Sequence, residues 1–247
     1  DEQHESEFVQ NYGTRSDSHG DFIEYPPAGV LNTHSFLNRY PTTDTNRNRA
    51  RSRWTFYHFL GVDVEKSAAR TTDPEALADT DNPTMNNPAC TVCHELLDPV
   101  AGAFQNYGND GKYRDGHLGR DALPDSYKFA DQENTDDSNS YQEGDTWFRD
   151  MRTPGFDGGL VNNPDHSLSW LGEQIADDPR FATAAIKFWW PAIMGSEVAR
   201  APEIATDANF SDQPTLFEEQ NKFISELGES FRPVSYTHLT LPTIYSV

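Results

Sequence analysis

The stretch PACTVCHELLDPVAG, residues 88–102, decides the fold expected of this chain. Pro88 suits the first position of a helix, because its φ is already helical and its missing N–H is not needed there. Cys90 and Cys93 are three residues apart, and His94 follows directly. On a helix these three side chains share one turn. The sequence therefore predicts two thiols and an imidazole gathered at the start of one helix.

Two thiols at positions i and i+3 can each add to a vinyl group of the same porphyrin. The adjacent histidine then supplies the proximal imidazole of the iron. Cys90 and Cys93 are the whole thiol inventory, so long-range disulfides cannot be their purpose. Because two thioether bonds fix the haem, a loop-rich protein can hold it without a large apolar pocket. We expect one covalent haem c at Cys90, Cys93 and His94.

Three other interpretations of the cysteine pair compete with haem attachment. Zinc needs four ligands, whereas this motif offers three crowded ones and the chain has no second cysteine pair. A thioredoxin-like redox pair is typical of a βαβ surround, which the sequence does not predict. The third alternative is two unpaired structural cysteines. The spacing together with the histidine favours haem.

The residues after the motif resemble a known family. His94 to Gly102 is followed by Phe104-Gln105-Asn106-Tyr107 and by Gly111-Lys112-Tyr113-Arg114. This order is similar to the cytochrome-c-like domain of unknown function 1588, which occurs in large exported bacterial proteins. The family pattern runs CxxCH, Asp-Pro-x-Gly, an aromatic stretch and Gly-x-Tyr/Trp-Arg. Here the segment between Pro99 and Gly102 is one residue longer. The resemblance covers residues 29–195 loosely and implies a c-type haem and a periplasmic or otherwise extracytoplasmic location, but no substrate.

Met151 is the candidate for the sixth iron ligand. It lies in Met151-Arg152-Thr153-Pro154, at a distance from His94 comparable to that of the axial methionine in small class I cytochromes. A Met/His pair would raise the reduction potential, as electron transfer tends to need. The alternatives are Met85, His58, Met194 and an open iron without a sixth ligand. An open iron would favour small-molecule chemistry.

Arginine recurs at every second position just before an aromatic stretch, at Arg47, Arg49, Arg51 and Arg53. These guanidinium groups could pair with haem propionates, because arginine suits buried carboxylates. The alternative without a role in haem binding is a solvated helix face or salt bridges to an acidic surface, and we favour this alternative.

Composition limits the partners of this chain. It carries 40 acidic against 19 basic side chains, for a net charge of −21. Nucleic acid is therefore not expected, because a phosphate backbone needs a cationic surface. The acidity favours solubility, with attraction of a cationic redox partner as the sharper alternative. No run of about 18 apolar residues is present, so no membrane-spanning segment is expected in this fragment.

Helical periodicity dominates the regions outside the cysteine motif, and the fold class expected is mainly α. Helices are predicted near 29–39, at 45–60, at 167–176, from Pro179 until Pro191 kinks or ends it, and at 214–231. In the helix from Pro179 we expect Phe181, Ala184, Ala185 and Phe188 to be buried. In 214–231 we expect an inward face of Leu216, Phe217, Phe223, Ile224, Leu227 and Phe231. Pro99 and Gly102 should limit the regularity of the cysteine helix.

The expected organisation has four parts. They are a polar entry segment (1–28), a c-type haem domain with long irregular loops (29–198), a helical linker or the start of a following domain (199–233), and a non-native tail (234–247). The acidic segment 131–145 is predicted to be a solvated loop. Val234 to Thr243 resembles the translated end of a sequencing adapter, so we expect a non-native tail and a natural chain that continues past Pro233.

These observations predict an electron-transfer domain within or alongside a larger periplasmic oxidoreductase, rather than a self-contained enzyme. Its partner would be a redox protein or domain. Two alternatives stay open. One is a peroxidase-like haem enzyme with an open iron. The other is a non-redox envelope interaction module whose cysteine pair is structural.

Overall fold

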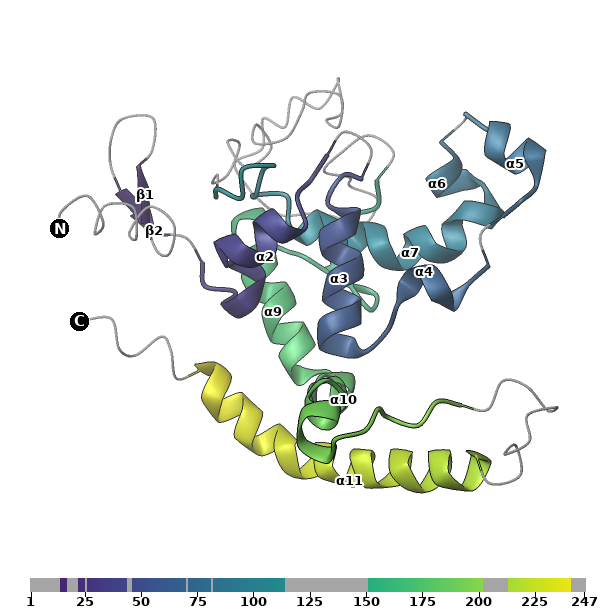
Figure 1. The fold of residues 1–247 in the computed structure, drawn as a ribbon. Coiled ribbons are helices and arrows are strands. Elements are labelled where there is room, and N and C mark those ends of the chain that lie inside the picture. The colour runs from purple at the N-terminus through teal and green to yellow at the C-terminus, as the bar shows by residue number, and fades with distance from the viewer. Residues whose placement is uncertain are drawn as a thin grey trace. The chain divides into compact units, whose positions relative to one another are not determined.

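The computed structural model describes residues 14–16, 22–24, 26–43, 46–69, 71–80, 82–113, 151–201 and 213–240. Within these ranges the chain is mainly α-helical, which confirms the predicted fold class (Figure 1). The larger helices are α2 (His34–Arg39), α3 (Arg49–Leu60), α7 (Pro88–Ala103), α9 (Ser167–Asp177), α10 (Pro179–Met194) and α11 (Gln213–Thr240). The short elements are η1 (Gly29–Asn32), α4 (Val64–Ser67), α5 (Pro74–Ala78), α6 (Pro83–Asn86), η3 (Pro164–His166), and the strands β1 (Thr14–Ser16), β2 (Phe22–Glu24), β3 (Gly155–Phe156) and β4 (Gly159–Leu160).

The chain divides into two compact units. Unit 1 comprises residues 1–55 and 63–174, and unit 2 comprises residues 56–62 and 175–247. Helix α7 and the cysteine motif belong to unit 1. The domain bounds expected from the sequence, 29–198 and 199–233, stay a prediction.

Several helices begin directly after a residue whose side chain caps the first turn. The Thr33 hydroxyl accepts a hydrogen bond from the Phe36 amide at the start of α2. The carboxylates of Asp73 and Asp178 do the same for α5 and α10, each just before a proline. A side-chain oxygen at this position satisfies one of the amides that a helix leaves unpaired. The caps therefore fix where these helices begin.

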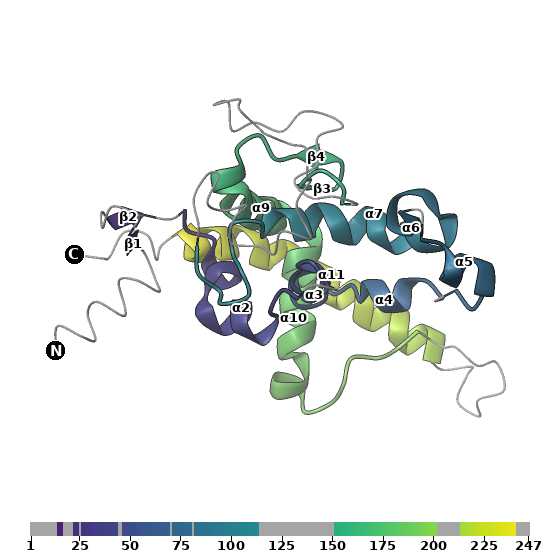
Figure 2. The same ribbon diagram turned by 90° about the horizontal axis from the view of Figure 1, so that it is seen from above.

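The core of unit 1 forms around the second half of α7. Val100, Ala101 and Ala103 are buried there, and the ring of Phe104 stacks on that of Phe36 with centroids 6.2 Å apart. The Ser167 hydroxyl donates to the carbonyl of Ala103 over 2.8 Å and so joins the start of α9 to the end of α7. In Figure 2, β3 and α9 lie beside the C-terminal half of α7, whereas α5 and α6 lie at its N-terminal end.

Arg51 on α3 is fully buried and ties three segments of unit 1 together. Its guanidinium donates to the carbonyls of Leu37 and Tyr40 on one side and of Tyr107 and Gly108 on the other, over 2.7 to 3.2 Å. A fifth hydrogen bond goes to the side-chain oxygen of Asn48. Burial lowers the pKa of Arg51 to about 9, against the opposing effect of Asp110 and Tyr107. The side chain still carries its charge at neutral pH.

Asn48 itself has a left-handed backbone with φ of 64°, as does Arg47 with φ of 45°. Asparagine tolerates this conformation better than most residues. Its amide donates to the Thr42 hydroxyl, and its side chain donates to the carbonyl of Phe104. The turn before α3 is thereby held to the end of α7, and α3 begins at Arg49 rather than near residue 45.

A short hairpin follows Met151. Strands β3 and β4 pair antiparallel, and the residues between them, Asp157 and Gly158, both have positive φ. Two left-handed residues between strands are typical of a type I′ turn, for which Asp-Gly is a favoured pair. A Cβ at Gly155 would collide with the carbonyl of Gly159, so the two strands need a glycine there. The hairpin sets the position of the chain that leads out of Met151.

Unit 2 is built from α10, α11 and residues 56–62. Phe59 stacks on Phe181, and Trp190 meets Phe223 edge to face with centroids 6.2 Å apart. Ile224 is fully buried and Gly228 lies against Thr183, so one narrow seam joins α11 to α10. At Gly61 the φ of 69° ends α3, as the sequence predicts, and a Cβ there would lie 3.6 Å from Ala184.

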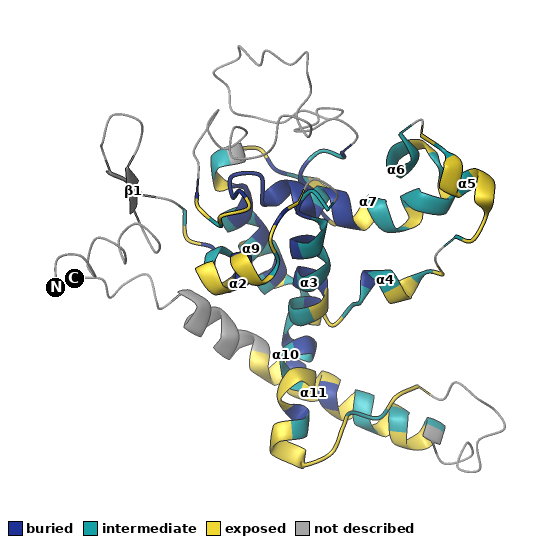
Figure 3. Cartoon of the chain, turned by 45° about the horizontal axis from the view of Figure 1, so that its top comes forward, coloured by how far each residue is buried: buried dark blue, intermediate teal, exposed yellow. Residues whose placement is uncertain are grey.

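The inward faces predicted for α10 and α11 are only partly correct. Of the large side chains expected to be buried, Phe188 is 64% exposed, and Leu216, Phe223, Leu227 and Phe231 are also exposed. Figure 3 shows exposed residues along both helices. Periodicity reveals an apolar stripe along a helix, but the neighbouring helix determines how much of that stripe is buried. On the described part of α11, the buried residues of the stripe are Ile224 and Gly228.

Both prolines lie inside helices, so Pro191 does not end its helix, while a kink at Pro191 and a reduced regularity at Pro99 stay predictions. Pro191 lies inside α10, which continues to Met194 and ends at Gly195 with φ of 70°. Pro99 likewise lies inside α7. A proline inside a helix removes one backbone hydrogen bond. The backbone of α11 continues through Thr240, into the predicted adapter-like tail, while the predicted loop 131–145 lies outside the described residues.

Candidate haem-attachment site

Helix α7 begins at Pro88, two residues before Cys90, so the whole cysteine motif is helical. Asn87 is its N-cap and accepts a hydrogen bond from the amide of Ala89, with Pro88 at the first helical position. The side-chain amide of Asn87 donates to the Asp79 carboxylate over 2.8 Å. This contact ties the start of α7 to the segment after α5. The start of α7, whose first two turns carry Cys90 and Cys93, is therefore held through its cap.

Cys90, Cys93 and His94 share one face of α7. A helix turns about 100° per residue, so Cys90, His94, Leu97 and Ala101 form one stripe, with Cys93 beside it. Leu97 and Ala101 are buried, whereas the two cysteines and the histidine are only partly covered. The face that packs into the core at the end of α7 is thus left partly open at its beginning (Figure 3).

Both thiols are available for covalent chemistry. Cys90 and Cys93 are free cysteines and form no disulfide with each other. The Cys93 thiol donates weakly to the carbonyl of Val64 on α4, over 3.9 Å. A thiol engaged only by such a weak contact can react without breaking a structural interaction. Attachment of a group through these sulfurs would therefore cost the fold little.

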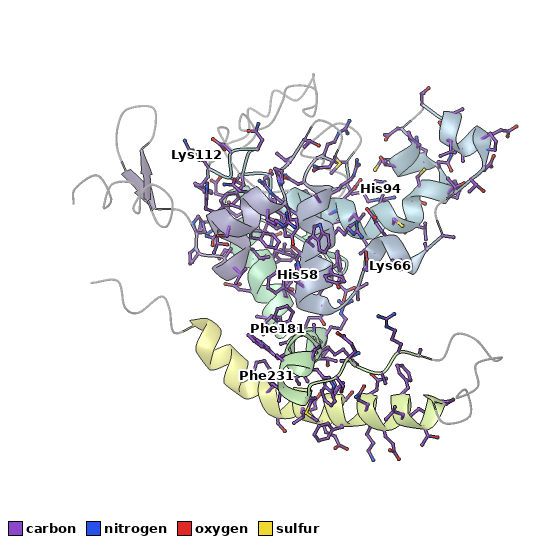
Figure 4. The ribbon with its side chains drawn as sticks, viewed as in Figure 1. His58, Lys66, His94, Lys112, Phe181 and Phe231 are labelled. Carbon is purple, nitrogen blue, oxygen red and sulfur yellow. The ribbon has the colours of Figure 1, made fainter. Side chains whose placement is uncertain are left out.

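His94 is held by a buried carboxylate on its own helix. Its Nδ1 lies 2.9 Å from Oδ1 of Asp98, one turn further along α7. Arg49 on α3 grips the same carboxylate with two hydrogen bonds, from Nε to Oδ1 over 2.7 Å and from Nη2 to Oδ2 over 3.0 Å. Asp98 is completely buried. Figure 4 shows His94 on α7 among the side chains of unit 1.

The Asp98 carboxylate is ionised. Burial alone raises its pKa, but hydrogen bonds from His94 and Arg49, together with their charges, outweigh burial and leave the pKa below its usual value. An ionised acceptor facing Nδ1 requires a proton on that nitrogen. When the His94 ring is neutral, its other nitrogen, Nε2, therefore carries no proton, and an unprotonated ring nitrogen is the form that binds a metal ion.

Met151 lies in the same cluster. It is completely buried, and its sulfur accepts a hydrogen bond from Nη2 of Arg49 over 3.0 Å. Met151 and Asp98 are therefore both hydrogen-bonded to the guanidinium group of Arg49. The sulfur would have to leave Arg49 to bind iron. Axial ligation by Met151 stays a prediction.

The other candidate ligands are placed differently. Met85 lies on α6, directly before α7, and is partly exposed. Met194 is exposed at the end of α10 in unit 2. His58 also belongs to unit 2, and burial lowers its pKa. This is the behaviour expected of a histidine packed among aromatic residues.

The arginine run does not form a solvated helix face. Arg49 binds Asp98, and Arg51 is buried against carbonyl oxygens. Arg53 pairs with Asp63 on the chain leading into α4 and also with Glu65, over 3.1 and 2.8 Å. Salt bridges to an acidic surface were one of the two alternatives. Arg53 fits that interpretation, whereas the partner of Arg49, Asp98, is buried. With these donors engaged, the contacts do not favour a role for the run in binding propionates.

Asp98 and its contacts were missed from the sequence. The signal was present, because His94 and Asp98 are four residues apart and such pairs meet on a helix. The partner Arg49 lies 49 residues earlier in the chain, and only the fold brings it near. Arg51 gave no signal, because its acceptors are backbone carbonyls.

The surface beside the motif has both polar and apolar parts. An open depression of about 730 Å³ is lined by residues of α5, the segment after it and the start of α7, among them Asp73, Glu75, Asp79, Pro88 and Ala89. Further along α7, Val92 and Leu96 are exposed one turn apart. In the described part of the chain, no three His, Cys, Asp or Glu side chains are grouped to hold a metal ion.

The residues present fit a covalently attached haem. Two free thiols and an imidazole lie on one partly open face of α7, and the donor set is that of a c-type haem. The Nδ1 of the imidazole is occupied by Asp98, which leaves Nε2 for iron. The haem would supply a one-electron redox centre at this position.

Comparison with known proteins supports the family resemblance. Residues 27–117 match the family described as "PSCyt3: Protein of unknown function (DUF1588)". This confirms the resemblance drawn from the motif, over a range that holds η1, α2 to α7 and the Gly111-Lys112-Tyr113 segment. The match ends before residue 195, which the sequence resemblance had loosely included. No curated protein and no solved structure matches the chain.

Among the described residues, none of the helices combines the length and the apolar character that crossing a membrane requires. The match to a family of unknown function assigns no substrate and no reaction.

Proposed function

We propose that this chain binds one haem c through Cys90 and Cys93, with His94 as an axial ligand, and that it transfers single electrons within or alongside a larger exported oxidoreductase. The observation that carries the proposal is the arrangement on α7. Two free thiols and an oriented imidazole occupy the core-facing stripe of the helix where that stripe is still partly open.

The openness of this stripe supports haem over a purely structural cysteine pair. At its C-terminal end α7 is covered by apolar partners, and Val100 and Ala101 are fully buried. At its N-terminal end the same face carries Cys90, Cys93 and His94 with only partial cover. A porphyrin attached there would cover that face with apolar surface, which is favourable by about 25 cal/mol for each Å² buried.

Two further points support a redox role. The name of the matching family, PSCyt3, suggests a cytochrome-type haem. The acid excess of 40 to 19 gives the chain an anionic character suited to a cationic redox partner. Thioether attachment takes place outside the cytoplasm, so a periplasmic or otherwise extracytoplasmic location belongs to the same proposal.

The proposal is tested by expressing the full chain with a c-haem maturation system and recording a pyridine haemochrome spectrum. We expect a c-type spectrum with one haem per chain. The double variant Cys90→Ser/Cys93→Ser should contain no covalent haem, and His166→Ala, an exposed histidine on η3, should retain it. A colourless wild-type chain with two free thiols would show that the cysteine pair is structural.

A second measurement separates an electron carrier from an enzyme with an open iron. The haem protein is reduced and exposed to carbon monoxide, and the oxidised protein is exposed to peroxide. An electron carrier should cycle reversibly between its two oxidation states and show no peroxide turnover. Rapid turnover of peroxide would instead support the peroxidase-like alternative.

A further inference from the structure

We infer that Asp98, held by Arg49, is a positioning residue that orients His94 with Nδ1 toward the carboxylate and Nε2 toward the iron. This inference rests on the proposed haem attachment and deepens it, because it assigns a role to residues outside the cysteine motif. Nothing in the motif itself requires a carboxylate at this position.

The geometry leaves the imidazole little freedom. The bond between Nδ1 of His94 and Oδ1 of Asp98 is 2.9 Å long and spans one turn of α7. Asp98 cannot rotate away, because Arg49 binds both of its oxygens in a two-pronged contact. Arg49 belongs to α3, which is a different helix. The ring of His94 is therefore oriented by two helices rather than by its own backbone alone.

The charges around this contact are nearly balanced. Asp98 is fully buried and carries one negative charge, and the guanidinium of Arg49 supplies one positive charge at hydrogen-bond distance. A buried carboxylate without such a partner would be strongly destabilising. The pair can therefore keep an anion next to the axial histidine inside the protein.

The sulfur of Met151 adds a further contact to the same guanidinium. It accepts from Nη2 of Arg49 over 3.0 Å, and Nη2 also donates to Oδ2 of Asp98. A buried thioether that fills the space beside the guanidinium limits its movement. In this arrangement Met151 supports the clamp on Asp98, which is an alternative to its predicted role as an iron ligand.

A carboxylate that accepts the Nδ1 proton changes the ligand that iron sees. It makes the imidazole more electron-rich at Nε2, because the Nδ1–H bond is polarised toward the anion. An electron-rich ligand stabilises ferric over ferrous iron. Asp98 should therefore lower the reduction potential of the haem, compared with a histidine whose Nδ1 faces a neutral acceptor.

The test compares Asp98→Asn with the wild type in the full chain loaded with haem. Asparagine has nearly the same size but no charge. The reduction potential should shift to a more positive value, with covalent haem content unchanged, and the iron–imidazole stretching band in the reduced protein should move to lower frequency. Arg49→Lys, which keeps the charge but loses the two-pronged contact, should shift the potential in the same direction by less.

The matched control is Asp63→Asn. Asp63 is also gripped by an arginine through two hydrogen bonds, from Nε and Nη2 of Arg53, and it belongs to unit 1, but it makes no contact with His94. Its substitution should leave the potential and the stretching band unchanged. Equal effects of the Asp63 and Asp98 substitutions, or no effect of either, would overturn the inference.

A failure of the proposed function would be recognised separately. If the wild-type chain takes up no haem, the ring-nitrogen NMR shifts of His94 are measured in the haem-free chain. A single tautomer with the proton on Nδ1 would uphold the pairing with Asp98. The mixture typical of an unrestrained imidazole would overturn it. The same wild-type measurement decides the inference if Asp98→Asn fails to fold.

Discussion

Two arginines of α3, separated by one residue, differ in what they bind and therefore in what they do. Arg51 is fully buried and donates to four backbone carbonyls and one asparagine side chain, all of them neutral. Arg49 binds a buried carboxylate that in turn holds His94. The first contact joins segments of the fold, whereas the second reaches the side chain proposed to bind iron.

The comparison shows that a repeated residue type need not have one role. Arg49, Arg51 and Arg53 alternate along the sequence, and successive side chains two residues apart point in different directions from a helix. Arg51 faces the loop after α7, and Arg49 faces the middle of α7. Stability and haem chemistry should therefore respond differently to substitution at these two positions.

The largest effect is expected for Arg51→Met. Removing the guanidinium takes one donor away from the carbonyls of Leu37, Tyr40, Tyr107 and Gly108. The Gly108 carbonyl keeps its bond from the Gly111 amide. Each carbonyl left unsatisfied costs about 1–3 kcal/mol. Partial relaxation and water entry should reduce the total loss of unfolding free energy to about 3–5 kcal/mol. Denaturant unfolding measures it. A loss below about 1 kcal/mol would show that Arg51 does not secure these segments.

An intermediate effect is expected for Arg49→Lys. Lysine keeps the positive charge near Asp98 but cannot reproduce the two-pronged contact, so unfolding free energy should fall by about 1–3 kcal/mol. Arg53→Lys is the control on the same helix. Its partner Asp63 is partly exposed, and the cost there should stay below about 1 kcal/mol. Equal losses at the two positions would remove the distinction between them.

The pH dependence of stability tests the ionised state of Asp98. Because its pKa in the folded chain lies below the ordinary value of about 3.9, the carboxylate stabilises the fold above that value. This stability is lost as pH falls through the lower pKa of the folded state. Unfolding free energy should therefore fall more steeply below about pH 4 in the wild type than in Asp98→Asn. Parallel curves would contradict a lowered pKa.

The smallest effect is expected for Met151→Leu. The two side chains have similar volume, so unfolding free energy should change by less than about 1.5 kcal/mol. If Met151 supports Arg49, the absorption spectrum of the haem should be nearly unchanged. Loss of a low-spin, six-coordinate spectrum in this variant would show instead that its sulfur leaves Arg49 and binds iron.

Local signals in the sequence anticipated the start of the candidate site well. The motif from Pro88 to His94 predicted a helix with both thiols and the imidazole on one turn, and α7 has this form. The caps at Thr33, Asp73 and Asp178 were equally local. Each depends on residues within a few positions, so the chain needs no long-range contact to reveal them.

Long-range contacts could not be predicted in the same way. The pairing of Arg49 with Asp98 spans 49 residues, and the acceptors of Arg51 are carbonyls that carry no sequence signature. On α11 the apolar stripe was visible, but its buried part, Ile224 and Gly228, depends on the shape of α10. In each case the sequence shows that a side chain is able to make a contact, but its partner is known only once the chain is folded.

The most direct test of the account is the intact mass of the full chain after maturation, denaturation and treatment with a thiol-alkylating reagent. Because denaturation removes any haem that is not covalently bound, the account predicts a mass increased by one haem, with no alkylation at Cys90 or Cys93. A chain without added haem that carries two alkyl groups would contradict it.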